Sequence, residues 1–176
     1  MSFISQNQLK LIKKLVTLTV LVSVFLCSSL QASTASLKKL KKGKMNTASG
    51  KTLHLYLALH EDEQTQGLSE VLPQELKDNE GMIFVYKTDE IRRFWMPNTF
   101  IDLDIFFLDA KFKVLSISRN TPSHPGWDEF PIPIARTQNV LCRHILELKS
   151  SSPLAKEIKE GNTLKWASAF SLLETK

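Results

Sequence analysis

Residues 94–108 read FWMPNTFIDLDIFFL, and this stretch carries most of the information about the fold. From position 101 onward, large apolar side chains occupy every second position, and the alternate positions begin with Asp102 and Asp104. Alternation with a period of two is typical of a β-strand with one buried face. The segment therefore predicts a strand whose other face is acidic at its start and apolar further along.

The chain on both sides of this stretch predicts more strands than helices. Four leucines alternate between positions 53 and 59, and residues 82–86 form a short apolar run. Four of the seven prolines fall within 120–133, which predicts a long loop or a lid. The strands that we expect are 52–59, 82–86, 101–108, 112–118, 140–148 and 163–173.

Residues typical of helix termini predict two short helices. Three acidic residues open the segment 61–67, where carboxylates meet the positive end of the helix dipole, and Gly67 is a suitable end. Ser152 and Pro153 fit the cap and first helical position of a second helix that reaches Gly161. We therefore predict an α+β fold, compact and mostly β, with a barrel- or sandwich-like mixed sheet and two or three short helices.

The first 35 residues have the pattern of a secretory signal peptide. They carry three lysines and no acidic residue, then an apolar stretch over 15–26, then small residues up to Ala35. The apolar stretch is shorter than the roughly 20 residues of a spanning helix, so membrane contact is expected only during export. Leu26 is too large for a lipid-attachment motif at Cys27. The pattern predicts a periplasmic or otherwise exported protein without a lipid or membrane anchor, cleaved after Ala35 or, as the alternative, after Ala32.

The basic charge of the chain lies near its N-terminus. The formal net charge is +5, yet from position 51 onward 15 basic residues face all 18 acidic ones. That balance removes the main support for nucleic-acid binding, and we expect no nucleic-acid partner. Five lysines lie within 36–50, which we interpret as a basic flexible linker. The expected organisation is a signal peptide over 1–35, the linker over 36–50 and a single domain over 51–174.

Cysteine and histidine spacing predicts neither a disulfide nor a metal site. After removal of the signal peptide Cys142 is the only cysteine, and its apolar surroundings favour a small buried side chain over a nucleophile. The four histidines form no zinc-binding pattern, and no nucleotide-binding or hydrolase motif occurs. We expect no metal and no cofactor.

Several short motifs follow one another along the chain: GLS (67–69), EGMIF (80–84), FWMPNT (94–99), LDIFF (103–107), Asp109, LE (146–147) and GN (161–162). Their order resembles the DUF192 (UPF0127) family of uncharacterised proteins, which are often exported. The resemblance implies a compact, β-rich mixed fold and no agreed activity. Three positions depart from the family pattern: Ser69 replaces Met, Pro97 replaces Lys and Asn162 replaces Asp.

The segment 92–99 offers the groups of a small polar-ligand site. Arg92, Trp95, Asn98 and Thr99 combine an aromatic surface with fixed hydrogen-bond donors, which is what such a site requires. The alternative is that Trp95 belongs to the core and that Asn98 and Thr99 form a local turn. Trp127, in the proline-rich loop, could cover such a site.

A second candidate is the carboxylate pair. Asp102 and Asp104 lie two positions apart on a strand, so both should project from one face, where they could bind a cation or divide acid and base roles. Alternatively they form a solvated face or pair with nearby arginines. His124 is the histidine best placed to assist.

These patterns favour an exported, β-rich, non-enzymatic module that binds a small polar ligand or a cell-envelope component. Two alternatives stay open: an envelope-directed enzyme that uses Asp102 and Asp104, and a structural domain that acts through protein contacts.

Overall fold

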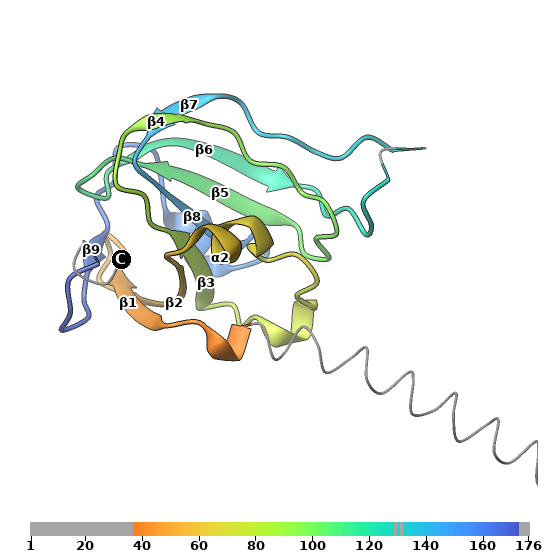
Figure 1. Cartoon of the computed structure of the whole chain (residues 1–176). Helices are drawn as coiled ribbons and strands as arrows, with labels where there is room; N and C mark the ends of the chain where they lie inside the picture. The colour runs from red at the N-terminus through yellow and green to blue at the C-terminus, as the bar shows by residue number, and fades with distance from the viewer. Residues whose placement is uncertain (1–36, 129, 131, 173–176) are drawn as a thin grey trace, which may run out of the picture. The chain divides into compact units, whose positions relative to one another are not determined.

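The structure, a computed structural model, describes residues 37–128, 130 and 132–172 (Figure 1). The expected signal peptide, 1–35, lies outside the described residues. The fold is mostly β, with a curled mixed sheet and short helices, as predicted. The elements are β1 Lys42–Asn46, β2 Thr52–Ala58, α2 Glu61–Gln66, the 3-10 turn η1 Pro73–Glu75, β3 Glu80–Phe84, β4 Glu90–Arg92, β5 Leu103–Leu108, β6 Val114–Thr121, β7 Val140–Cys142, β8 His144–Lys149, α3 Pro153–Glu157 and β9 Lys165–Trp166.

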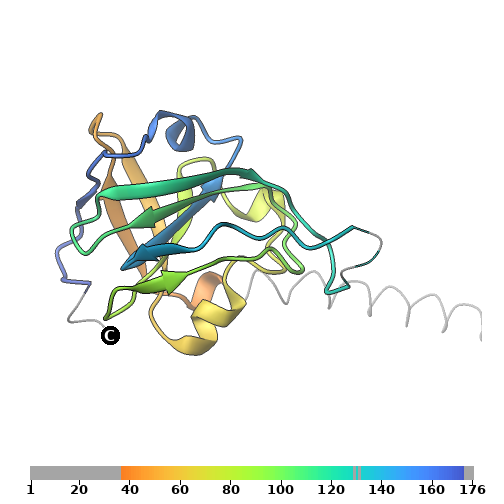
Figure 2. The same cartoon turned by 90° about the horizontal axis from the view of Figure 1, so that it is seen from above.

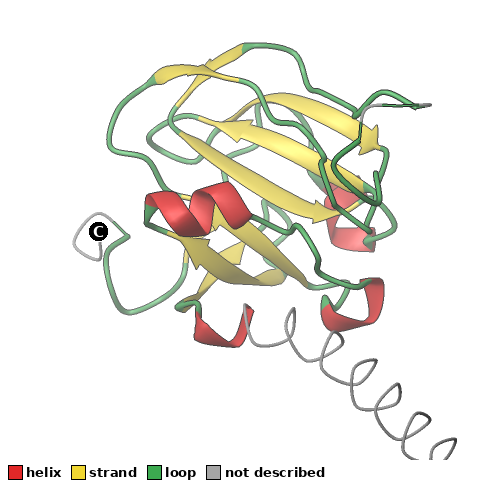
Figure 3. Ribbon diagram, turned by 45° about the vertical axis from the view of Figure 1, so that its right-hand side comes forward, coloured by secondary structure: helices red, strands yellow, loops and turns green. Residues whose placement is uncertain are grey.

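Seven strands form the main sheet, in the order β6-β5-β8-β3-β2-β1-β9. The pair β2–β3 is parallel, and the other pairs of this sheet are antiparallel. Helices α2 and α3 lie on opposite sides of it (Figure 2). Strands β4 and β7 form a separate antiparallel ribbon (Figure 3). The parallel pair is joined through α2, because parallel strands need a crossover connection.

Alternation along the strands sends two sets of side chains to opposite faces of the sheet. On the α3 side, Leu55, Leu57, Ile83, Phe106 and Leu146 belong to one hydrophobic core cluster. The opposite side chains of the same strands face the α2 side, and they are also buried: Met82, Phe84, Ile105, Phe107, Ile145 and Glu147. The central strands are therefore covered on both faces, which explains why β5 is buried along its whole length.

The prediction of a flexible linker is wrong over residues 42–46, because these residues form β1. This strand pairs with β2 and β9, its lysines Lys42 and Lys44 are exposed, and Met45 is fully buried. The buried position 43 is a glycine, so the sequence shows no apolar alternation over this strand. The ring of Trp166 occupies the space of a side chain there, since a Cβ on Gly43 would lie 2.1 Å from that ring. The folded unit therefore begins before position 51.

Helix α2, Glu61–Gln66, confirms the predicted helix, and Gly67, whose φ is 50°, is its C-cap. The expected strand over 140–148 is divided at Arg143, so that β7 pairs with β4 while β8 enters the main sheet. The last expected strand is only Lys165–Trp166, and α3 ends at Glu157 rather than near Gly161. Among the described residues, no helix is long and apolar enough to span a membrane.

Candidate functional site

A cavity of about 270 Å³ opens on the α2 side of the sheet. The end of α2 and the turn after it form one wall, and the segment 93–99 forms another. Trp127 from the proline-rich loop also lines it, as do Phe84, Tyr86, Leu103 and Glu147 from the strands or their ends. The cavity thus lies between the sheet and three segments that are distant in sequence.

Glu147 is the buried charged group of this cavity. It lies on β8 between Met82 of β3 and Ile105 of β5, and its residue is only 4% exposed. No hydrogen bond or ion pair joins its carboxyl group to any residue in the described ranges. Burial raises its pKa to about 8, because the charged form is taken out of water without compensation. A carboxyl group is seldom buried without a partner, so this one requires a functional explanation.

Aromatic rings make up much of the lining. Trp95 and Trp127 meet edge to face with their ring centres 6.3 Å apart, and both are at least half exposed. Phe84 and Phe94 meet similarly at 4.8 Å. Burial raises the pKa of Tyr86 to about 12, so its phenol stays protonated at neutral pH. The cavity offers ring faces and edges around one acidic group.

The segment 94–99 is fixed on two sides by hydrogen bonds. Ser69 Oγ donates to the carbonyl oxygen of Pro97 at 3.0 Å. Asn98 and Glu70 form a clasp: the Glu70 amide donates to the Asn98 carbonyl at 2.8 Å, and Asn98 Nδ2 donates to Glu70 Oε1 at 3.0 Å. Both residues have positive φ, 48° and 66°. On the other side, the backbones of Thr99 and His124 exchange two hydrogen bonds.

Two of the departures from the family pattern meet in this wall. Ser69 and Pro97 are hydrogen-bonded to each other, from Ser69 Oγ to the Pro97 carbonyl oxygen, and both line the cavity.

An outer hollow adjoins the cavity and shares four lining residues with it, Thr65, Gln66, Ser69 and Trp127. The other two residues that line the hollow are Glu61 and Asp62, in the first turn of α2. Both are exposed. The approach to the cavity is therefore acidic on its α2 side.

The structure brings some of the predicted site residues to the cavity. Trp95 and Thr99 line it, and so does Trp127. Asn98 forms the clasp described above. Arg92 lies against the ring of Tyr86, with its guanidinium carbon 3.5 Å from the ring centre, and Arg93 rather than Arg92 lines the cavity. His124 forms a hydrogen bond within the proline-rich loop, with its Nε2 2.8 Å from the carbonyl oxygen of Asp128.

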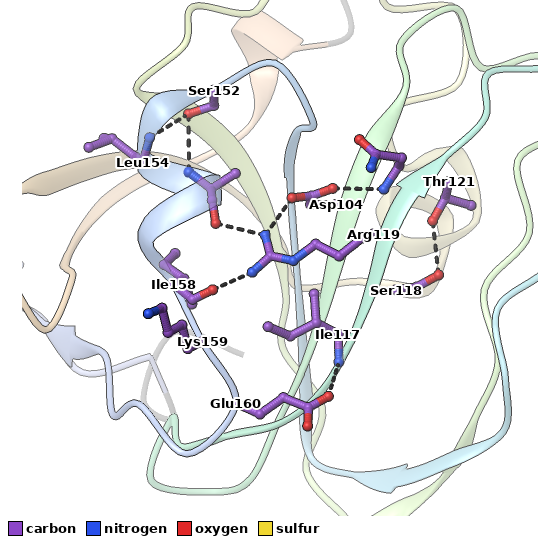
Figure 4. A network of polar contacts seen from close by, with 12 residues as sticks. Asp104, Ile117, Ser118, Arg119, Thr121, Ser152, Leu154, Ile158, Lys159 and Glu160 are labelled. Carbon is purple, nitrogen blue, oxygen red and sulfur yellow. Dashed lines mark hydrogen bonds and ion pairs between the residues drawn. The ribbon is translucent and has the colours of Figure 1, made fainter.

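The two predicted carboxylates, Asp102 and Asp104, lie away from the cavity. Asp104 is buried on the α3 side, where its carboxylate lies 2.6 Å from Arg119 and accepts from the Asn120 amide at 2.9 Å. Arg119 also donates to the carbonyl of Ala155 at 2.8 Å and to that of Ile158, at the end of α3 (Figure 4). Asp102 is exposed and accepts from the Ser123 amide at 2.7 Å. Neither aspartate lines the cavity, and only Asp104 has the buried ion pair and hydrogen bonds of a structural residue.

Sequence reasoning missed Glu147, Tyr86, Arg93 and Gln64 as lining residues. One signal for Glu147 was present: the segment 144–148 reads HILEL, a charged residue within an apolar run. Charged residues are almost never fully buried without a partner, so an acid in a central strand is worth examining as a site.

Two other titratable groups of the interior, His144 and Cys142, are enclosed by other residues of the fold. His144 is buried, accepts from the Tyr86 amide at 3.3 Å and stacks on Phe112. Burial raises the pKa of Cys142 to about 11, which keeps its thiol protonated and unreactive. Within the described ranges, no three His, Cys, Asp or Glu side chains are grouped as metal ligands.

The fold and the sequence are similar to those of known proteins. A protein from Sinorhizobium meliloti 1021, described as a candidate transcription regulator, is 23% identical, with 72% of this chain and 95% of that chain covered and a TM-score of 0.59. A protein of unknown function from Novosphingobium aromaticivorans DSM 12444 is 28% identical, with coverage of 72% and 85% and a TM-score of 0.56. No curated protein matches the chain.

The family model assigns the chain more directly than these two structures. The model named DUF192, described as "Uncharacterized ACR", matches residues 44–166, which include most of β1, all the walls of the cavity and Glu147. The chain belongs to the DUF192 family, as its motifs predicted.

Proposed function

We propose that this protein is an exported module that binds a small ligand in the cavity above Glu147. The observation that carries the proposal is a carboxyl group that is 4% exposed, has no hydrogen-bond or ion-pair partner in the described part of the chain, and lines a cavity of about 270 Å³. Burying an ionisable group without a partner costs stability, and such groups are concentrated at binding and catalytic sites.

The test of ligand binding uses a mixed panel of small neutral, anionic and cationic compounds. Binding is followed through the indole N–H signals of Trp95 and Trp127 in NMR spectra. We expect at least one compound to shift them. The variant Thr65→Trp places a large ring at the exposed residue shared by the cavity and the outer hollow, and it should abolish the shifts.

A matched control is Lys156→Trp, which adds the same ring to an exposed position of α3 on the other side of the sheet. This variant should bind like the original chain. If no compound in the panel binds, or if Thr65→Trp binds as well as Lys156→Trp, the cavity is not a ligand site.

Export is supported by the signal pattern over 1–35 and is tested by cell fractionation and by the mass of the secreted chain. The expected mature N-terminus is Ser36. Cleavage there would leave β1, which pairs with β2 and β9, in the mature chain. Recovery of the uncleaved chain from the cytosol would contradict this part of the proposal.

A second candidate is an enzyme that uses Glu147, rather than Asp102 and Asp104, as an acid or base. It is favoured by the pKa of about 8, since a general acid or base works best near the ambient pH. A ligand identified by native mass spectrometry of the chain isolated from its own cells provides the test. Chemical change of that ligand by the original chain, and not by Glu147→Gln, would favour the enzyme over the binding module.

A further inference from the structure

We infer that the occupant of the cavity is a small organic cation of the alkylammonium class. This inference rests on the proposed ligand site and names the chemistry that the site selects. The observation that carries it is the buried Glu147 carboxyl group, which has no partner among the described residues, beside a wall of aromatic side chains: Phe84, Tyr86, Phe94, Trp95 and Trp127.

A cation supplies what the buried carboxyl group lacks. An ammonium group next to Glu147 would form the ion pair that no described residue forms, and in a site removed from water such a pair is strong. The methyl or methylene groups around the nitrogen would contact the rings, whose electron-rich faces attract positive charge. Rings alone would accept any apolar ligand, so it is the acid among the rings that favours a cation.

The charges around the cavity also favour a cation. Glu147 lies inside, and Glu61 and Asp62 line the outer hollow. The other residues that α2 contributes, Gln64, Thr65 and Gln66, are uncharged. A hollow of one charge sign raises the local concentration of ligands of the opposite sign.

The groups that face Glu147 do not neutralise it. Met82 of β3 and Ile105 of β5 flank it in the sheet and cannot ionise. Tyr86 keeps its proton, and Arg92 lies against the Tyr86 ring, in contact with Thr88 and Glu90. Arg93 is the basic residue among those that line the cavity; it is exposed and forms no ion pair with any described residue.

A pair of probes with one shape separates charge from size. Choline carries a quaternary ammonium group, and 3,3-dimethyl-1-butanol has the same outline with a carbon atom in place of the nitrogen. Titration calorimetry at pH 8 should give choline at least tenfold tighter binding than the alcohol. Glu147→Gln, which keeps the shape and removes the charge, should bring the two affinities within about threefold of each other.

The pH dependence gives an independent readout with a definite sign. Choline does not titrate, so its binding must ionise Glu147 and release one proton. Its affinity should therefore rise about tenfold per pH unit up to pH 7, level off above pH 8 and become flat in Glu147→Gln. A ligand that accepts a hydrogen bond from the protonated acid would show the opposite trend, with affinity falling above pH 8.

The outcomes separate this inference from the proposed function. If neutral compounds of the mixed panel bind and Thr65→Trp blocks them, while choline binds no better than 3,3-dimethyl-1-butanol, the cavity is a ligand site and the cation inference is wrong. If no compound of any charge binds, both are wrong. Tighter binding of the cation with the rising pH profile supports both.

Discussion

Two buried carboxyl groups on neighbouring strands of this protein have opposite surroundings. Asp104 on β5 faces α3 and contacts Arg119 and a backbone amide. Glu147 on β8 faces α2 and a cavity and is bonded to no described residue. Their positions are close in the sheet, because Asp104 pairs with Leu148 and Ile105 pairs with Glu147. One carboxylate joins strands to a helix, while the other has no hydrogen-bond or ion-pair partner among the described residues. Burial is common to both groups, so it is the lack of such a partner that makes Glu147 the candidate.

The comparison predicts that removing the charge has opposite effects at the two positions. Glu147 has a pKa of about 8 in the folded chain against an ordinary value of 4.5. Its contribution to stability is therefore fully present below pH 4.5, is lost as the pH rises to 8, and is constant above. Glu147→Gln does not titrate, so at pH 9 it should unfold with a free energy higher by on the order of 4 kcal/mol.

The measurement for Glu147→Gln is urea unfolding of both chains between pH 4 and pH 9. The difference in the free energy of unfolding should vanish near pH 4 and reach its maximum above pH 8. A variant that is less stable than the original chain at pH 9 would mean that the Glu147 carboxylate has a partner after all.

At Asp104 the same kind of change should destabilise. Asp104→Asn leaves the Arg119 guanidinium without its counter-charge next to the end of α3, although Arg119 remains partly exposed. We expect a loss of about 3 kcal/mol in the free energy of unfolding. Chemical denaturation at pH 7 measures it. A loss below 1 kcal/mol would show that the pair is not a structural link.

The clasp between Asn98 and Glu70 should behave like the Asp104 region on a smaller scale. Asn98→Ala removes one side-chain hydrogen bond and places alanine at a φ of 48°, a conformation that asparagine tolerates better. The expected loss is about 1–2 kcal/mol. Asn139→Ala, at an exposed position away from the clasp, is the control and should change stability by less than about 0.5 kcal/mol. Equal losses of stability in Asn98→Ala and Asn139→Ala would show that the clasp does not stabilise the fold.

The smallest effect is expected at Asp102, the other member of the carboxylate pair. Asp102→Asn keeps an acceptor for the Ser123 amide and changes an exposed charge. The free energy of unfolding should change by about 0.5 kcal/mol or less, and choline affinity should stay the same. A large loss of binding in this variant would return Asp102 to the site.

Much of the fold followed from alternation and end signals. The central strand β5, helix α2 and the start of α3 were predicted because apolar periodicity, Gly67 and Ser152-Pro153 are local features. Strand β1 was missed because Gly43 fills a buried position without an apolar side chain, and that need arises from Trp166, more than a hundred positions away. Local patterns cannot report contacts of that range.

The site was harder to predict than the fold for the same reason. The segment 94–99 was recognised, and Trp95 and Thr99 do line the cavity. Asp104 and Glu147 look alike in the sequence, as acids within apolar strands. Only the tertiary arrangement places Arg119 beside one and a cavity beside the other. Apolar periodicity predicts which side chains share a face of a strand. It does not predict which distant segment packs against that face.

The most direct test of the account is an NMR titration of the Glu147 side-chain carboxyl carbon, with and without choline. The account predicts a midpoint near pH 8 in the free protein, shifted to lower pH when choline is bound, because the cation stabilises the carboxylate. A midpoint near 4.5 in the free protein, or one that choline leaves unchanged, would contradict the claim that Glu147 is a buried acid, without a partner among the described residues, that receives a cation.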